Sequence, residues 1–150
     1  MAHTYANLVY HIVYSTKHRH PLIDEDLRDR LYGYMGGIVR EEGSSLMEVG
    51  GVADHVHLLV RSKPSLSVSD LVQQIKGSSS RWVNELPDRQ ETFHWQEGYG
   101  AFSVSESGVE KVRRYIRSQE EHHRRFSFKD ELVTLLKRHR ISYDEDRLWD

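Results

Sequence analysis

The amino-acid sequence predicts an α+β fold built around an antiparallel sheet. Segments rich in β-branched and aromatic residues alternate with segments whose apolar residues recur every three or four positions, in the order β-α-β-β-α-β-α-α. Asp or Ser residues that favour helix starts precede the helical segments. A chain of 150 residues with these elements is expected to form one domain, residues 1–150, in which residues 127–150 are a C-terminal helix and an acidic tail.

The first half of the chain predicts a strand, a helix and a hairpin. Residues 5–16 have the composition of a strand that is buried on at least one face. Residues 24–42 follow as a helix, because their apolar side chains recur at helical spacing and Gly43 supplies a stop signal. Residues 46–52 and 55–61 then predict two strands joined by a tight turn.

The second half predicts three helices and one more strand. Each helix follows a Ser that has an acidic residue three positions later, the pattern of a capping box. These pairs are Ser67–Asp70, Ser107–Glu110 and Ser127–Asp130. The expected elements are a helix to about residue 86, a strand within 93–105, a helix from 108 to about 125 and a helix to 138. The acidic segment 141–150 is expected to be an extended tail or an arm that docks a partner. Two β-α-β-type halves are typical of the ferredoxin-like arrangement, an antiparallel sheet with helices packed on one face.

The composition excludes several kinds of chemistry. The chain has no cysteine, which excludes disulfide scaffolds, thiolate zinc sites, iron–sulfur clusters and cysteine nucleophiles. No apolar stretch approaches the roughly 20 residues of a membrane span, and the N-terminal segment lacks the basic region of a signal peptide, so a cytoplasmic protein without a membrane partner is expected. The net charge is −2, so any binding of nucleic acid must depend on a local basic patch.

The strongest local motif is His55-Val56-His57, in the second strand of the predicted hairpin. Side chains alternate along a strand, so His55 and His57 face one side while Val56 faces the core. The two imidazoles could then converge on one metal ion. The alternative is a pair of surface histidines on a half-buried strand. A histidine-triad hydrolase is excluded, because it would need a third His where the chain has Leu59.

A second motif lies on the third predicted helix, where Tyr115 and Gln119 are one turn apart at the edge of an apolar stripe. The alternative is that Tyr115 only packs and Gln119 is only solvated. Residues 111–125 contain six Lys or Arg and two Glu, and such a concentration of positive charge favours a phosphodiester partner. A solvated charged face is the other interpretation of this cluster.

The two motifs together resemble the HUH single-tyrosine transposases, enzymes of insertion sequences that act on single-stranded DNA, and their relatives associated with repetitive extragenic palindromes. The His-hydrophobe-His motif of the family matches residues 55–57, and its Tyr-Ile-x-x-Gln motif matches residues 115–119. Family members often carry Asn before the Gln, and Ser118 departs from this pattern. The similarity extends over about residues 5–125.

The resemblance implies a transposase that nicks single-stranded DNA and transfers the strand. Tyr115 would be the nucleophile of a 5′-phosphotyrosine intermediate, and His55, His57 and Gln119 would hold Mg²⁺ or Mn²⁺, without a nucleotide cofactor. Expected partners are single-stranded DNA hairpins and a second copy of the chain, in a homodimer with composite active sites. The residues expected to contact DNA are Lys111, Arg113, Arg114, Arg117, Lys76 and Arg81.

Two other functions stay open at the level of sequence. The first is a domesticated relative that binds DNA or processes repeats without transposition. The second is an unrelated metal-dependent nucleotide hydrolase, which predicts turnover that does not need Tyr115 and binding that depends weakly on salt.

Overall fold

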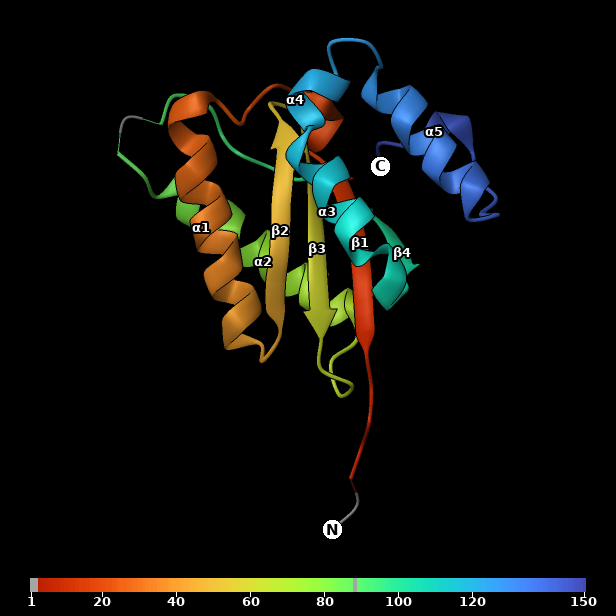
Figure 1. Cartoon of the computed structure of the whole chain (residues 1–150). Helices are drawn as coiled ribbons and strands as arrows, with labels where there is room; N and C mark the ends of the chain where they lie inside the picture. Colours follow the sequence, from red (N-terminus) through yellow and green to blue (C-terminus); the bar gives the residue numbers. More distant parts are fainter. Residues whose placement is uncertain (1–2, 88) are drawn as a thin grey trace.

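Four strands form one antiparallel sheet in the computed structural model, which describes residues 3–87 and 89–150 (Figure 1). The sheet has the order β2-β3-β1-β4, so the first and third strands of the chain are central. The strands are β1 (Leu8–Ser15), β2 (Ser45–Val52), β3 (His55–Ser62) and β4 (Gly100–Val104). Every neighbouring pair is antiparallel, so the predicted α+β arrangement of the sheet is confirmed.

The first two helices cover one face of the sheet. α1 (Glu25–Glu41) and α2 (Val68–Asn84) pack on alternate residues of the central strands, including Ile12 and Leu58, which are fully buried. Each helix begins where the sequence indicates, because Asp24 and Ser67 accept hydrogen bonds from backbone N–H groups three residues later. The β-α-β-β-α-β core therefore has both of its helices on one face, as predicted.

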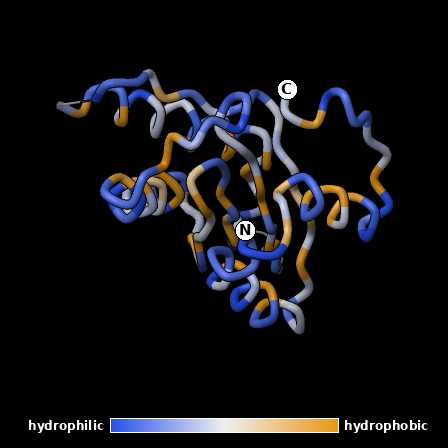
Figure 2. The backbone as a smooth tube through the Cα atoms, turned by 90° about the horizontal axis from the view of Figure 1, so that it is seen from above, coloured by the Kyte–Doolittle hydropathy of each residue, from blue (hydrophilic) through white to orange (hydrophobic). Residues whose placement is uncertain are grey.

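The opposite face is covered by the C-terminal helices, which the prediction of helices on one face did not place. These are α3 (Val109–Arg117), α4 (Gln119–His122) and α5 (Phe128–Arg138). They pack there because the other set of alternate strand residues, Val9 and Val13 among them, is also apolar and buried. Seen from above, helices lie on both sides of the strands, and their hydrophobic and hydrophilic stretches alternate (Figure 2).

The helix predicted from residue 108 to about 125 is wrong in two respects. Ser107 does not cap it, because residues 106–108 form a 3-10 helix and Gly108 precedes α3 without a side-chain cap. The helix also breaks at Ser118, whose hydroxyl donates to the Tyr115 carbonyl oxygen at 3.1 Å. Such a local bond competes with the helical backbone bonds, so α4 starts as a separate turn.

The acidic tail is not an extended arm. It contains a 3-10 helix, Glu145–Arg147, and folds back onto the domain. The Asp150 carbonyl oxygen accepts hydrogen bonds from the Gly98 N–H and from Gln96 Nε2, both at 2.9 Å. The Trp149 ring packs at 5.1 Å from the Phe128 ring, at the start of α5. The tail therefore fixes α5 against the sheet.

No helix in residues 3–87 and 89–150 combines the length and the apolar character that crossing a membrane requires.

Candidate active site

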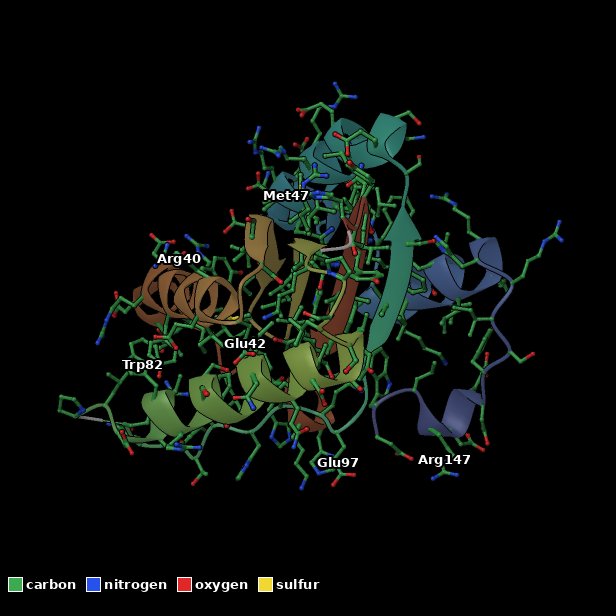
Figure 3. All side chains as sticks on the ribbon, turned by 90° about the horizontal axis from the view of Figure 1, so that it is seen from below. Arg40, Glu42, Met47, Trp82, Glu97 and Arg147 are labelled. Atoms are coloured by element: carbon green, nitrogen blue, oxygen red, sulfur yellow. The ribbon has the colours of Figure 1, made fainter. Side chains whose placement is uncertain are left out.

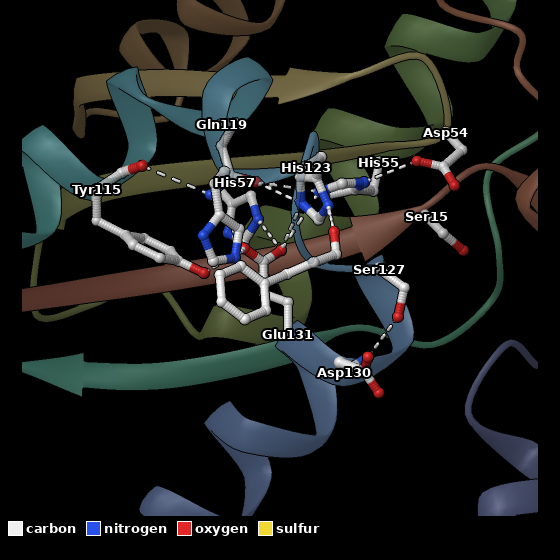
Figure 4. A network of polar contacts seen from close by, with 12 residues as sticks. Ser15, Asp54, His55, His57, Tyr115, Gln119, His123, Ser127, Asp130 and Glu131 are labelled. Carbon is white, nitrogen blue, oxygen red and sulfur yellow. Dashed lines mark hydrogen bonds and ion pairs between the residues drawn. The ribbon is translucent and has the colours of Figure 1, made fainter.

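His55 and His57 project from β3 toward the face that α3, α4 and α5 cover (Figure 4). Val56, between them, lies in the core under α1 and α2, as the alternation along the strand predicts. Both imidazoles are completely buried, which excludes the interpretation of two surface histidines. A buried imidazole needs polar partners, and β1, Asp54 and the C-terminal helices supply them.

Glu131 on α5 lies at the centre of these partners. Its Oε1 atom is 2.8 Å from His57 Nε2, 3.4 Å from His55 Nε2 and 3.2 Å from His123 Nε2. Neither Glu131 nor His123 was predicted from the sequence as a site residue. A signal for Glu131 was present, because it is an acidic residue within the helical stripe of Phe128 and Leu132, which are buried.

Gln119, at the start of α4, contacts three residues of this cluster. Its Oε1 atom lies 3.2 Å from His55 Nε2 and 2.9 Å from His123 Nε2, and its Nε2 donates to Glu131 Oε2 at 3.1 Å. The side chain is buried, so the interpretation of a solvated glutamine is wrong. The structure thus brings together the three residues expected to hold a metal, and adds two more with donor atoms.

The donor atoms fit a single divalent ion. One atom each from His55, His57, His123 and Glu131 lies within 4.8 Å of all the others. Ligand atoms at right angles around an ion that binds at about 2.1 Å lie about 3.0 Å apart. The measured separations between neighbouring donors, including Gln119, run from 2.8 to 3.4 Å.

Tyr115 lies beside this cluster in the same chain. Its hydroxyl donates a hydrogen bond to Glu131 Oε2, and its ring is perpendicular to the His57 ring at a centroid distance of 5.7 Å. Burial and the Glu131 carboxylate raise the pKa of Tyr115 above its ordinary value. All residues of this cluster come from one chain, and the homodimer with composite active sites stays a prediction.

Gly50 allows α3 to lie directly on the sheet. It faces His57 across β2 and β3, and a Cβ atom added to it would be 2.3 Å from the Ile116 carbonyl oxygen. Any larger residue would push this turn of α3 outward. Because Tyr115 precedes Ile116, the close contact at Gly50 sets the distance between the tyrosine and the histidines.

A second layer of residues orients the two histidines of β3. His57 Nδ1 lies 2.8 Å from His11 Nε2, and His55 Nδ1 lies 2.8 Å from Asp54 Oδ1. Partners of this kind fix the ring orientation and tautomer of a metal-binding histidine. Burial, together with His57, lowers the pKa of His11 to about 3, so this partner is neutral.

The basic residues expected to contact DNA lie on two opposite faces. α3 carries Lys111, Arg113, Arg114 and Arg117. Lys76 and Arg81 lie on α2, on the other side of the sheet (Figure 3). Lys76 Nζ donates there to three backbone carbonyl oxygens of residues 96–98, at 2.6 to 3.2 Å. The structure therefore places four of the six near Tyr115 and two far from it, and the role of each stays a prediction.

Comparison with known proteins relates this arrangement to one family. Residues 4–119 match the family described as transposase IS200 like. The ISDra2 transposase TnpA of Deinococcus radiodurans is 29% identical over 117 residues, which cover 75% of this chain and 84% of that protein. The transposase for insertion sequence element IS200 of Salmonella typhimurium is 29% identical over 125 residues, covering 79% and 81%.

Solved structures agree with this relationship. A crystal structure from Deinococcus radiodurans, assigned as a transposase, superposes with a TM-score of 0.63 at 27% identity and covers 79% of this chain and 96% of that one. A REP-associated tyrosine transposase bound to a REP hairpin gives a TM-score of 0.62 at 11% identity, covering 82% and 73%. The second likeness concerns the fold alone.

Proposed function

The chain belongs to the IS200-like transposase family, and from this premise we propose that it nicks single-stranded DNA and transfers the strand through a covalent bond to Tyr115. The observation that carries the proposal is the position of the Tyr115 hydroxyl. It donates to the same Glu131 carboxylate that contacts His55 and His57, so a nucleophile and a set of metal donors meet at one point.

The metal ligands in this proposal are His55, His57 and Gln119, and the donor atoms of His123 and Glu131 lie in the same cluster. When bound, Mg²⁺ or Mn²⁺ would polarise an oxygen of the scissile phosphate and offset its negative charge. Imidazole nitrogens suit Mn²⁺ better than Mg²⁺.

The residues of the chain position the reaction. The Tyr115 oxygen attacks phosphorus, the bond to the 3′ oxygen breaks, and the products are a 5′-phosphotyrosine and a free 3′-hydroxyl. Glu131 already accepts the hydrogen bond of the Tyr115 hydroxyl, which holds the nucleophile next to the metal donors. Attack by a second 3′-hydroxyl on the phosphotyrosine reverses these bond changes and joins new DNA. No nucleotide cofactor is needed, because the phosphotyrosine bond retains the free energy of the phosphodiester bond that was broken.

The substrate in this proposal is a single-stranded DNA hairpin. The solved REP-associated relative, which shares the fold, is bound to a REP hairpin, and the basic residues of α3 lie on the face of this chain that holds Tyr115. Such residues position a phosphodiester backbone without reading its sequence. We propose that the active site can assemble from residues of one chain, and the homodimer with composite active sites is the alternative.

The test is the formation of a covalent protein–DNA adduct. The protein is incubated with Mn²⁺ and a labelled pool of single-stranded hairpins with randomised flanks, and adducts are separated under denaturing conditions. The parental protein should give a labelled band, and Tyr115→Phe should give none while retaining DNA binding. Tyr99→Phe, at an exposed tyrosine, is the control. An adduct formed by Tyr115→Phe at the parental rate would show that the nucleophile is wrong, and a nucleotide hydrolase would form no adduct.

A further inference from the structure

A cavity of about 510 Å³ opens beside the nucleophile. Its walls are β4, α3 and α5, and Tyr115 lines one end. The volume lies within the range of about 300–1,000 Å³ that is usual for ligand sites. We propose that this cavity binds the unpaired base of the nucleotide next to the scissile phosphate. The inference rests on the proposed function and names a substrate contact of the same site.

The floor and one wall of the cavity are aromatic. Phe102 on β4 is buried, and the His139 ring lies 4.5 Å from it at an angle of 31°. Phe126, before α5, leaves 54% of its surface exposed, and the His122 ring stacks on it at 5.1 Å. Phe126 and His139 are exposed, and flat rings with an exposed face suit the stacking of an unpaired base.

Two cations border the cavity on facing helices. Lys111 lies one turn before Tyr115 on α3, and Arg138 lies two turns after Glu131 on α5. Across residues 3–87 and 89–150, neither has a carboxylate oxygen within 4.0 Å, whereas Arg117 on the same face is paired with Glu48 at 2.8 Å. Cations without carboxylate partners are free to contact phosphates.

The two carboxylates that line the cavity lie at the same end as Tyr115. Asp130 and Glu131 are at the start of α5, near Tyr115, and Arg138 is at the end of the same helix. An apolar cavity alone would suit many ligands, and cations alone would suit any anion. An aromatic cavity that runs from the nucleophile to two free cations fits a nucleotide, with its base inside and its next phosphate at the rim.

The test measures how much bases contribute to binding, in EDTA so that no cleavage occurs. Fluorescence anisotropy compares a labelled 12-nucleotide oligothymidylate with an abasic oligomer of equal length. Stacking of one base contributes about 1–3 kcal/mol, which corresponds to a roughly 5- to 150-fold preference for the base-bearing oligomer. Thr134→Trp, which fills the cavity from an exposed position of α5, should reduce this preference at least fivefold.

The controls use a neighbouring residue of the same helix that is outside the cavity. Lys137→Trp should retain the parental preference. Arg138→Gln should reduce the slope of log affinity against log salt by about 0.7, whereas Lys137→Gln should not. If Thr134→Trp does not fold, as judged by circular dichroism, His139→Ala takes its place with the same expected loss of preference.

The inference is overturned if the parental protein does not distinguish the two oligomers, or if a folded Thr134→Trp or His139→Ala retains the full preference. Its failure differs from failure of the proposed function. If the protein forms the Tyr115 adduct but shows no preference for bases, the proposed function stands and the base-binding cavity is wrong. A protein with base preference and no adduct would bind single-stranded DNA in this cavity without nicking it.

Discussion

Glu131 is a carboxylate at a core position of α5, with a side chain that is 1% exposed. Burial opposes its ionisation, but hydrogen bonds from His123, His55 and His57 hold the pKa of Glu131 far below its ordinary value. A charge buried without partners would cost several kcal/mol. The histidines and the carboxylate therefore stabilise one another, and together they present a ready set of donor atoms to a cation.

A Glu131→Gln substitution should weaken Mn²⁺ binding at least tenfold, because the amide removes the negative charge of the site while keeping its shape. Even indirect partners of metal ligands contribute about 10- to 100-fold to affinity. Titration calorimetry measures this without DNA. Asp130→Asn, at the exposed carboxylate immediately before Glu131, is the matched control and should bind Mn²⁺ as the parental protein does. If Glu131→Gln bound Mn²⁺ with the parental affinity, Glu131 would not be a metal ligand.

His11 makes stability depend on pH. Its pKa is lowered from 6.5 to about 3, chiefly by burial and by His57, so the unfolded chain takes up a proton near pH 6.5 that the folded chain does not. The stability that neutral His11 contributes is complete above pH 6.5 and is lost as the pH falls toward 3, by about 1.4 kcal/mol per pH unit. Urea unfolding of His11→Gln should show a flatter decline over this window, whereas exposed His94→Gln should decline like the parental protein.

For single residues, the sequence could predict the positions that depend on a local pattern. Strand alternation predicts that His55 and His57 share a face, and helical spacing predicts that Tyr115 and Gln119 are close. Helical spacing places Glu131 on the buried side of α5, but it lies 74 residues from His57, and no local pattern predicts that α5 folds over the sheet and brings the two together. The metal role of Gln119 remains a prediction.

Among the helices, α3 depends most directly on a single residue of the sheet. Gly50→Ala would place a methyl group 2.3 Å from the Ile116 carbonyl oxygen, so α3 must move outward. The expected loss of stability is about 1–3 kcal/mol, measured by chemical denaturation. Adduct formation by Tyr115 should fall more than metal binding does, since His55 and His57 lie on β3. Gly77→Ala, in α2 with open space around its Cβ, is the control and should be neutral or stabilising.

The limits of the helices were predicted where the signals are local and missed where several groups compete. Ser67 and Ser127 cap α2 and α5 as the capping pattern predicts. Ser107 shows the same pattern, but a 3-10 turn precedes α3 there. The break at Ser118 depends on a hydroxyl that bonds back to Tyr115, and it turns Gln119 into the cluster. Helical periodicity carries no information on such a bond.

Across the whole molecule, the two faces of the sheet differ in the residues that they bury. The α1–α2 face holds the larger hydrophobic core, whereas the α3–α5 face interrupts its apolar residues with the histidine and glutamate cluster. The family match covers residues 4–119, so α5 and the docked tail lie beyond it, although α5 supplies Glu131. Sequence patterns predicted the sheet, but the docking of the tail through Asp150 depends on long-range contacts that no local pattern encodes.

The separation of faces predicts where the protein contacts DNA. With a net charge of −2, only a local basic surface can draw in a polyanion, and α3 carries such a surface on the side of Tyr115. Arg114→Gln should weaken binding of single-stranded DNA and reduce the slope of log affinity against log salt by about 0.7. Arg40→Gln removes an equal, exposed charge from α1 on the opposite face, and it should leave the slope unchanged. Anisotropy titrations at several salt concentrations measure both slopes, and equal losses in the two variants would mean that DNA does not prefer the face that holds the tyrosine.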